Sequence, residues 1–269
     1  AEIIPLVESR SLDAVWLGLR VATTSADAGT KLAPGTKRGD ATRLGLVSAD
    51  GPGTVFAFVT GTFGRPEKVF DSSLPENSRD NITNLPPGAH THMSWAFTEP
   101  GVYTLRFRAT PAASGTLGNK QSGTLGNKQG SNQAADASGA VTSTLRIAVG
   151  VSPDKATADM PAGTEGAESR IVSKGHADIT ADIVNRRLVM RVDEPKPEDI
   201  PLENTVVHVP PKALQPIPAD PAFRFIGRPG SDVYQLPQAV LGKHVHGEID
   251  PHLWHDVTNA QAYVEVIRD

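Results

Sequence analysis

The stretch GVYTLRFRA, residues 101–109, decides the fold class of this chain. Tyr103, Leu105 and Phe107 alternate with Thr104, Arg106 and other residues of the opposite face. A period of two places the aromatic and aliphatic side chains on one face of an extended segment, whereas a helix would space them three or four positions apart. The stretch therefore predicts a half-buried β-strand that needs further strands beside it.

Similar runs recur along most of the chain. They are short and apolar, either at alternate positions or continuously, and none has helical spacing. Proline and glycine, with 22 and 25 residues, fall between the runs and mark turns. The runs are AVWLGLRV (14–21), TVFAFVT (54–60), TSTLRIAVG (142–150), RRLVMRVD (186–193), TVVHVP (205–210) and FRFIG (223–227).

The sequence therefore predicts a mainly β protein. Residues 1–150 are expected to form an immunoglobulin-like antiparallel sandwich, because short alternating strands are separated by regular turns. Residues 152–169 have the composition of a linker, so a second, smaller β unit is expected over 151–240, either separate or packed onto the first as one body. A short C-terminal loop and helix are expected over 241–269, where apolar residues recur at helical spacing.

Composition excludes several classes of function. The net charge of −4 argues against a basic surface for nucleic acid. The sequence contains no run of about 20 apolar residues, so it predicts no membrane-spanning helix. Cysteine is absent, which excludes disulfides, thiolate metal sites and a cysteine nucleophile. The chain has no nucleophile elbow, phosphate loop or dinucleotide fingerprint, so we expect a protein that is not an enzyme.

Four of the eight histidines lie close to the C-terminal end. Imidazole and carboxylate groups without thiolates suit Zn²⁺ or Mn²⁺, although a solvated polar loop leading into a helix has the same composition. The potential ligands are His244, His246, Glu248, Asp250, His252, His255 and Asp256.

A second histidine pair lies in GAHTHMSWAF, residues 88–97. His90 and His92 are two positions apart, so in a strand they project to the same face and suit one metal ion. A polar strand face that simply carries two histidines is the alternative, because the sequence does not locate a third or fourth ligand. His176 and His208 are isolated and are interpreted as ordinary strand-edge histidines.

The end of the chain, EIDPHLWHDVTNAQAYVEVIRD (248–269), resembles the zinc/manganese substrate-binding proteins of bacterial ABC transporters. The resemblance rests on the motif Asp-Pro-His-Leu-Trp followed by an Asn-Ala pair. It implies that His252 is a metal ligand at the cleft between two lobes, and that His244 and His246 belong to an accessory loop for metal capture. His255 departs from the aliphatic residue that is usual there.

The rest of the chain resembles a different family. NLPPGAHTHMSWAFTEPGVYTLRFRA (84–109) resembles the actinobacterial surface-anchored repeat, with its His-x-His-x-x-Trp-x-Phe-Thr-x-Pro-Gly-x-Tyr signature. GHADITADIVNRRLVMRVDE (175–194) and PADPAFRFIGRPGSDVYQLPQ (218–238) resemble the companion segment of such cell-wall proteins. These resemblances imply a β-rich module outside the cytoplasm.

Together the two resemblances imply an anchored repeat-type ABC transporter substrate-binding protein. Residues 1–238 would then be β modules inserted into a metal-binding protein that resumes at 239–269 and continues beyond the chain, leaving the His252 site incomplete. The implied partners are a Zn²⁺ or Mn²⁺ ion and an ABC permease, and the implied location is extracellular, at the cell surface. The alternative is a cell-surface spacer or interaction module that binds a protein partner and has no transport role.

Overall fold

The computed structural model describes residues 14–22, 41–61, 64–111, 134–135, 139–158 and 169–238. Strands account for most of the regular structure in these ranges, which confirms the mainly β prediction. The α-helix α1 (Asp154–Ala158) is a short exception. No helix within the described ranges has the length and apolar character that crossing a membrane requires. The loop and helix expected over 241–269 lie outside the described residues.

The first of three sheets, called the β1 sheet, has five strands in the order β14-β13-β12-β1-β6. Strand β1 lies between β12, which runs parallel to it, and β6, which runs antiparallel. The strands are β1 (Val15–Ala22), β6 (His90–His92), β12 (Gly175–Asp182), β13 (Arg187–Val192) and β14 (Glu198–Pro201).

The other two are called the β10 sheet and the β7 sheet. The β10 sheet has the order β11-β15-β10-β8-β2-β5, with β9 pairing β10, and the β7 sheet has the order β16-β17-β7-β3-β4. The strands of the β10 sheet are β2 (Thr42–Asp50), β5 (Ile82–Leu85), β8 (Gly101–Thr110), β9 (Ala134–Ala135), β10 (Val141–Val149), β11 (Arg170–Val172) and β15 (Thr205–Val209). Those of the β7 sheet are β3 (Val55–Thr60), β4 (Pro66–Asp71), β7 (Ser94–Phe97), β16 (Leu214–Pro216) and β17 (Asp232–Leu236).

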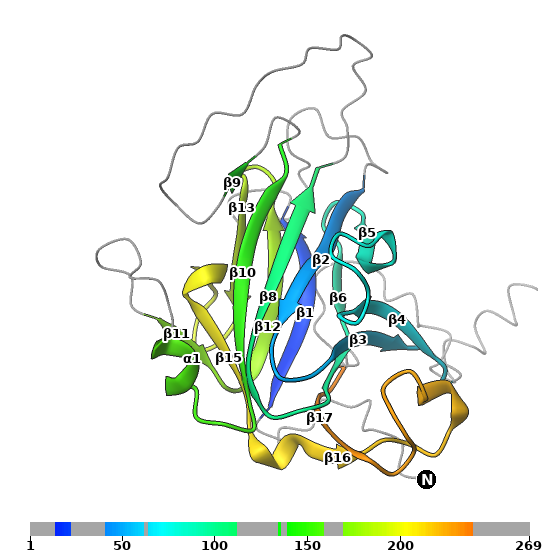
Figure 1. Ribbon diagram of the computed structural model, residues 1–269. Coiled ribbons are helices and arrows are strands. Elements are labelled where there is room, and N and C mark those ends of the chain that lie inside the picture. Colours follow the sequence, from blue (N-terminus) through cyan, green and yellow to red (C-terminus); the bar gives the residue numbers. More distant parts are fainter. Residues whose placement is uncertain are drawn as a thin grey trace, which may run out of the picture.

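One hydrophobic core joins the three sheets. In Figure 1 the strands β10, β8 and β2 lie in front of β12 and β1, and the β7 sheet lies at the lower end of the two layers. Leu17 of β1, Leu105 of β8 and Trp95 of β7 are fully buried in this core. Trp95 also donates a hydrogen bond of 3.0 Å from its indole nitrogen to the carbonyl of Leu17, which ties the β7 sheet to the β1 sheet.

The expected boundary near residue 150 does not separate two sheets. Strand β12 pairs with β1 from Val15↔Gly175 to Ala22↔Asp182, β15 pairs with β10, and β17 pairs with β7. Each sheet therefore combines strands from the ranges 1–150 and 151–240. The pairings of β1 with β12, β10 with β15 and β11 with β15 are parallel, and parallel neighbours need long crossover connections in place of hairpins.

The strand prediction for FRFIG (223–227) is wrong. Pro221–Phe223 form a 3-10 turn and the chain continues in turns to residue 226. Phe223 and Ile226 are buried against Phe58 of β3, in a small second cluster on the side of the β7 sheet that faces away from the main core. Tertiary packing, and not pairing with another strand, therefore buries this apolar run. We call the cluster, Phe56, Phe58, Ala96, Ile217, Phe223, Phe225, Ile226 and Val233, the aromatic patch.

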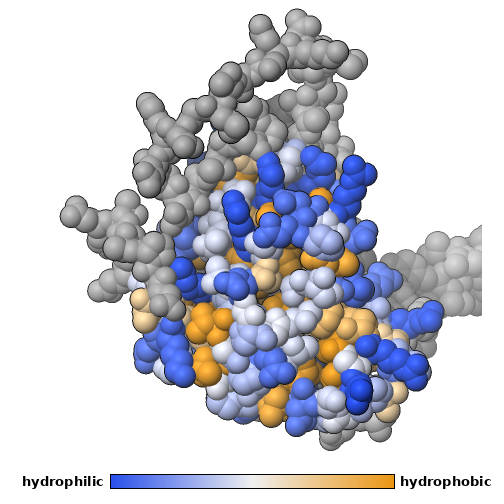
Figure 2. All heavy atoms as spheres, in the orientation of Figure 1, coloured by the Kyte–Doolittle hydropathy of each residue, from blue (hydrophilic) through white to orange (hydrophobic). Residues whose placement is uncertain are grey.

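The face of the molecule on which the β10 sheet lies in front is shown in Figure 2. Hydrophilic residues dominate its upper part, and hydrophobic residues are scattered over the lower part. This agrees with the alternation in β8, where Leu105 and Phe107 are buried while Arg106 and Arg108 are exposed.

The β1 sheet has two very different faces. Leu17, Leu19, Ile179 and Met190 point into the core and are fully buried. Because neighbouring residues of a strand point to opposite sides, the positions between them belong to the outer face. Apart from Trp16 and Val189, the side chains there are mostly polar, and the candidate site lies on this face.

Candidate metal centre

Four side chains that can bind a metal converge on the outer face of the β1 sheet: His90, His92, His176 and Asp178. We call them the His₃Asp cluster. The two residues of each pair are separated by one position, and β6 and β12 lie on either side of β1. Because side chains two apart share a face, both pairs project to the same side of the sheet.

Gly18 of β1 gives the cluster its space. In the sheet register it lies opposite both His92 and Asp178. A Cβ atom at this position would lie 2.2 Å from Asp178 Oδ1, 2.9 Å from the Thr91 carbonyl and 3.1 Å from His92 Cε1. Any side chain here would therefore displace the carboxylate, so the glycine lets groups from two strands approach across a third.

The ligand atoms lie at distances typical of a coordination shell. His90 Nε2 is 2.9 Å from His92 Nε2 and 3.0 Å from Asp178 Oδ2, and His92 Nε2 is 3.6 Å from Asp178 Oδ1. One ligand atom from each residue lies within 4.8 Å of all the others. Bonds of about 2.0–2.2 Å around tetrahedral zinc place neighbouring ligand atoms about 3.3–3.6 Å apart. The cluster could therefore hold a metal ion after small adjustments.

Burial makes this group of side chains costly without a cation. The side chains of His92 and Asp178 are each 1% exposed. Neither Asp178 oxygen, nor His92 Nδ1, has a hydrogen-bond partner of acceptable geometry among the described residues, despite the short contacts. Burial lowers the pKa of His92 to about 3, so its imidazole is neutral at physiological pH and keeps a lone pair for a metal. A buried carboxylate without hydrogen bonds is unfavourable, and a bound cation would compensate for it.

A carboxylate outside the cluster orients His176. Asp193 Oδ2 lies 3.0 Å from His176 Nδ1, and this interaction with His176 lowers the pKa of Asp193 to about 2. The same Nδ1 lies 3.9 Å from Asp178 Oδ2, so the His176 ring contacts both Asp193 and the cluster. A carboxylate behind a histidine ligand is a recurrent arrangement, because it fixes the tautomer and ring orientation.

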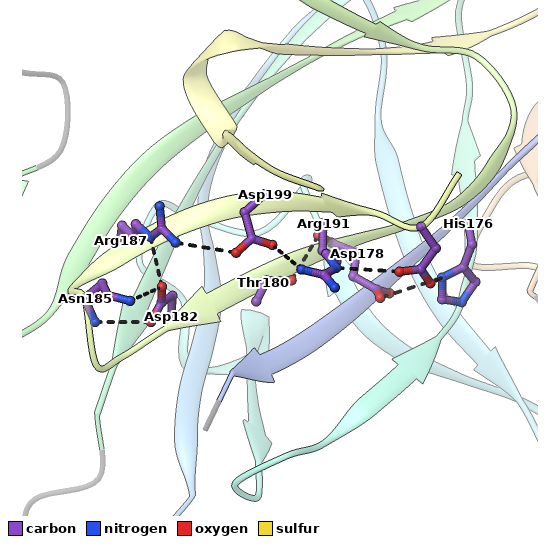
Figure 3. Close-up of polar contacts among 9 residues, drawn as sticks. His176, Asp178, Thr180, Asp182, Asn185, Arg187, Arg191 and Asp199 are labelled. Atoms are coloured by element: carbon purple, nitrogen blue, oxygen red, sulfur yellow. Dashed lines mark hydrogen bonds and ion pairs between the residues drawn. The ribbon is translucent and has the colours of Figure 1, made fainter. Parts of the chain in front are cut away.

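A chain of ion pairs continues from Asp193 along β13 and β14. Arg191 Nε lies 3.6 Å from Asp193 Oδ1, and Arg191 Nη1 lies 3.1 Å from Asp199 Oδ1. Arg187 then joins Asp199 to Asp182, at 3.4 and 2.9 Å. Figure 3 shows these side chains in a row from the turn after β12 to His176. The outer face of the sheet is thus a continuous network with the cluster at one end.

The structure places the predicted site residues unevenly. His90 and His92, whose metal-binding role the sequence left open, lie together with two residues that sequence reasoning missed, His176 and Asp178. His176 and His208 were both interpreted as ordinary strand-edge histidines. His208 lies in β15 of the β10 sheet, away from the cluster that contains His176. The predicted ligands His244, His246 and His252 lie outside the described residues.

One sequence signal could have indicated the missing ligands. His176 and Asp178 have the same one-residue separation as His90 and His92, and GHADITAD has strand character. The pattern does not, however, say that β12 lies two strands from β6.

Comparison with protein-family models, with curated proteins and with solved structures finds no match to this chain.

Proposed function

We propose that this protein binds a divalent transition metal, Zn²⁺ in preference to Mn²⁺, at the His₃Asp cluster, and that it handles metal outside the cytoplasm. The observation that carries the proposal is the convergence of three imidazoles and one buried carboxylate around a glycine. Four ligands of these types complete a tetrahedral site without help from another chain.

The donor set supports zinc over manganese. Three of the four ligands are imidazoles, which suit zinc, whereas manganese favours carboxylates, carbonyls and water. Zinc also binds such sites more tightly than manganese in the general order of divalent ions.

The wider role rests on the sequence resemblances. The Asp-Pro-His-Leu-Trp motif around His252 supports a substrate-binding component of an ABC importer, with a permease as its partner at the cell surface. In this role the β domain supplies a metal site separate from the one that His252 would join. We propose a binding protein and not an enzyme.

The alternative, a spacer or interaction module that contacts a protein through His90 and His92, has less support. Both histidines of a contact surface would be exposed, whereas the His92 side chain is 1% exposed and lies against Asp178, and only His90 of the pair borders solvent.

Calorimetric titration of zinc into the metal-free protein tests the proposal. We expect one zinc per chain at the cluster, an affinity at least about 100-fold lower in His92→Ala, and no loss in the matched control His208→Ala. The His244 region is kept intact in all three proteins, so that any zinc bound there adds equally to each. Equal affinities in wild type and His92→Ala would overturn the proposal.

A further inference from the structure

We infer that the metal at the His₃Asp cluster is exchangeable cargo, passed on by ligand exchange on the side of His90 to an acceptor that offers a nitrogen or oxygen donor. This inference rests on the proposed function and adds to it the route by which the ion leaves. A sealed structural zinc site would hold the same four ligands but would release the ion only when the protein unfolds.

The first observation is the uneven burial of the four ligands. The side chains of His92 and Asp178 are each 1% exposed, whereas those of His176 and His90 are 17% and 24% exposed. Half of the coordination shell is thus closed off from solvent and the other half borders it. An incoming donor can reach the ion from the His90 and His176 side without any opening of the core.

The second observation is how differently the two exposed ligands are held. His176 belongs to β12, an interior strand of the β1 sheet, and its ring is fixed by Asp193 at 3.0 Å. His90 belongs to β6, a strand of three residues at the edge of the sheet, and it is the first residue of that strand. Among the described residues, the His90 side chain makes its polar contacts with His92 and Asp178, which are cluster members themselves. His90 is therefore the ligand that leaves at the smallest cost to the fold.

The exchange step follows from this arrangement. A donor atom of the acceptor forms a bond to the ion, and the bond from His90 Nε2 breaks, so the ion keeps four ligands throughout. His90 departs as a neutral imidazole, and no electron is transferred. His176, His92 and Asp178 still hold the ion until further donors of the acceptor replace them.

Transfer kinetics test the inference. The zinc-loaded protein is first assayed for its zinc content, and then mixed with the chromogenic chelator 4-(2-pyridylazo)resorcinol over a range of concentrations. We expect the rate of zinc transfer to rise in proportion to the chelator concentration, because the chelator takes part in the step. A rate that is independent of chelator concentration and equal to the rate of global unfolding would overturn the inference.

Two variants assign the step to His90. His90→Ala should still bind zinc, with an affinity lowered about 10- to 100-fold, and should transfer it faster than wild type at every chelator concentration. His208→Ala, altered in a different sheet, should transfer zinc at the wild-type rate. If His90→Ala transfers zinc more slowly than wild type, His90 is not the departing ligand and the inference fails.

The zinc content at the start separates this inference from the proposed function. If none of the bound zinc is lost in His92→Ala, or no zinc binds at all, the proposed function itself is wrong. Zinc that is bound at the cluster but leaves only on unfolding contradicts the exchange route alone.

Discussion

The outer faces of the β1 sheet and the β7 sheet are both largely covered, but by opposite means. On the β7 sheet, Phe56 and Phe58 are covered by residues 217–226 of the same chain, with ring centroids 5.6–5.9 Å apart in edge-to-face contacts. On the β1 sheet, Asp178 and His92 lie among polar side chains, and His92 Nε2 is 3.6 Å from Asp178 Oδ1.

The difference shows which face is built for stability and which for binding. An apolar face is satisfied once it is removed from water. A buried polar face is satisfied only when each group has a partner, and the partners of Asp178 and His92 among the described residues are incomplete. Among the described residues, most of the buried side-chain polar atoms that lack a hydrogen bond of acceptable geometry belong to the cluster.

The largest effect is expected for Gly18→Ala. The new methyl group would lie 2.2 Å from Asp178 Oδ1 and 3.1 Å from His92 Cε1, so it would displace two ligands at once. We expect zinc affinity to fall at least about 100-fold, measured by calorimetry, which exceeds the range for losing a residue that only supports a ligand. The matched control is Gly61→Ala, where the nearest atom is 3.9 Å from the new Cβ. Wild-type affinity in folded Gly18→Ala would show that the cluster does not need this space.

A smaller effect is expected for Asp193→Asn, which retains the size of the side chain but removes the charge that holds His176 Nδ1 at 3.0 Å. Zinc affinity should fall about 10- to 100-fold, in the range found for carboxylates behind a histidine ligand. Cobalt-loaded protein gives a second readout, since its visible spectrum should change if His176 is reoriented.

The control for Asp193→Asn is Asp199→Asn, one ion pair further from the cluster through Arg191. Its zinc affinity should change less. An equal loss in both variants would mean that the network acts as one unit.

The smallest effect on zinc affinity is expected for Phe58→Ala. The side chain is fully buried in the aromatic patch, so its loss should lower the free energy of unfolding by about 3–5 kcal/mol, measured by denaturant titration. Zinc affinity, measured well below the melting temperature, should equal that of wild type. A parallel loss of affinity would show that the two outer faces are coupled through the core.

The sequence predicted individual strands well because their alternation is local. Tyr103, Leu105 and Phe107 are buried as their spacing indicated, and the runs around Leu145 and Met190 are also strands. Segment 223–227 was misjudged because a short apolar run packs equally well in a turn that covers a hydrophobic surface.

The site was only half predictable. The spacing of His90 and His92 placed two imidazoles on one strand face and left a metal role open, but the other half of the site depends on the parallel pairing of β12 with β1. That pairing joins segments far apart in the sequence, and no local pattern specifies it. Gly18, inside the run 14–21, was the one local sign that something approaches the backbone of β1 closely.

The parallel pairing of β1 with β12 has a consequence for how the protein is made. During synthesis His90 and His92 are translated long before His176 and Asp178. One edge of β1 therefore stays unpaired until β12 has been translated. Contacts of such large sequence separation form slowly, since a long loop must close before they contribute. The metal site thus comes into existence only when this long-range pairing has formed. Severing the chain near residue 150 should therefore leave neither piece with a complete ligand set, so zinc bound at the cluster would report on chains in which β1 has paired with β12.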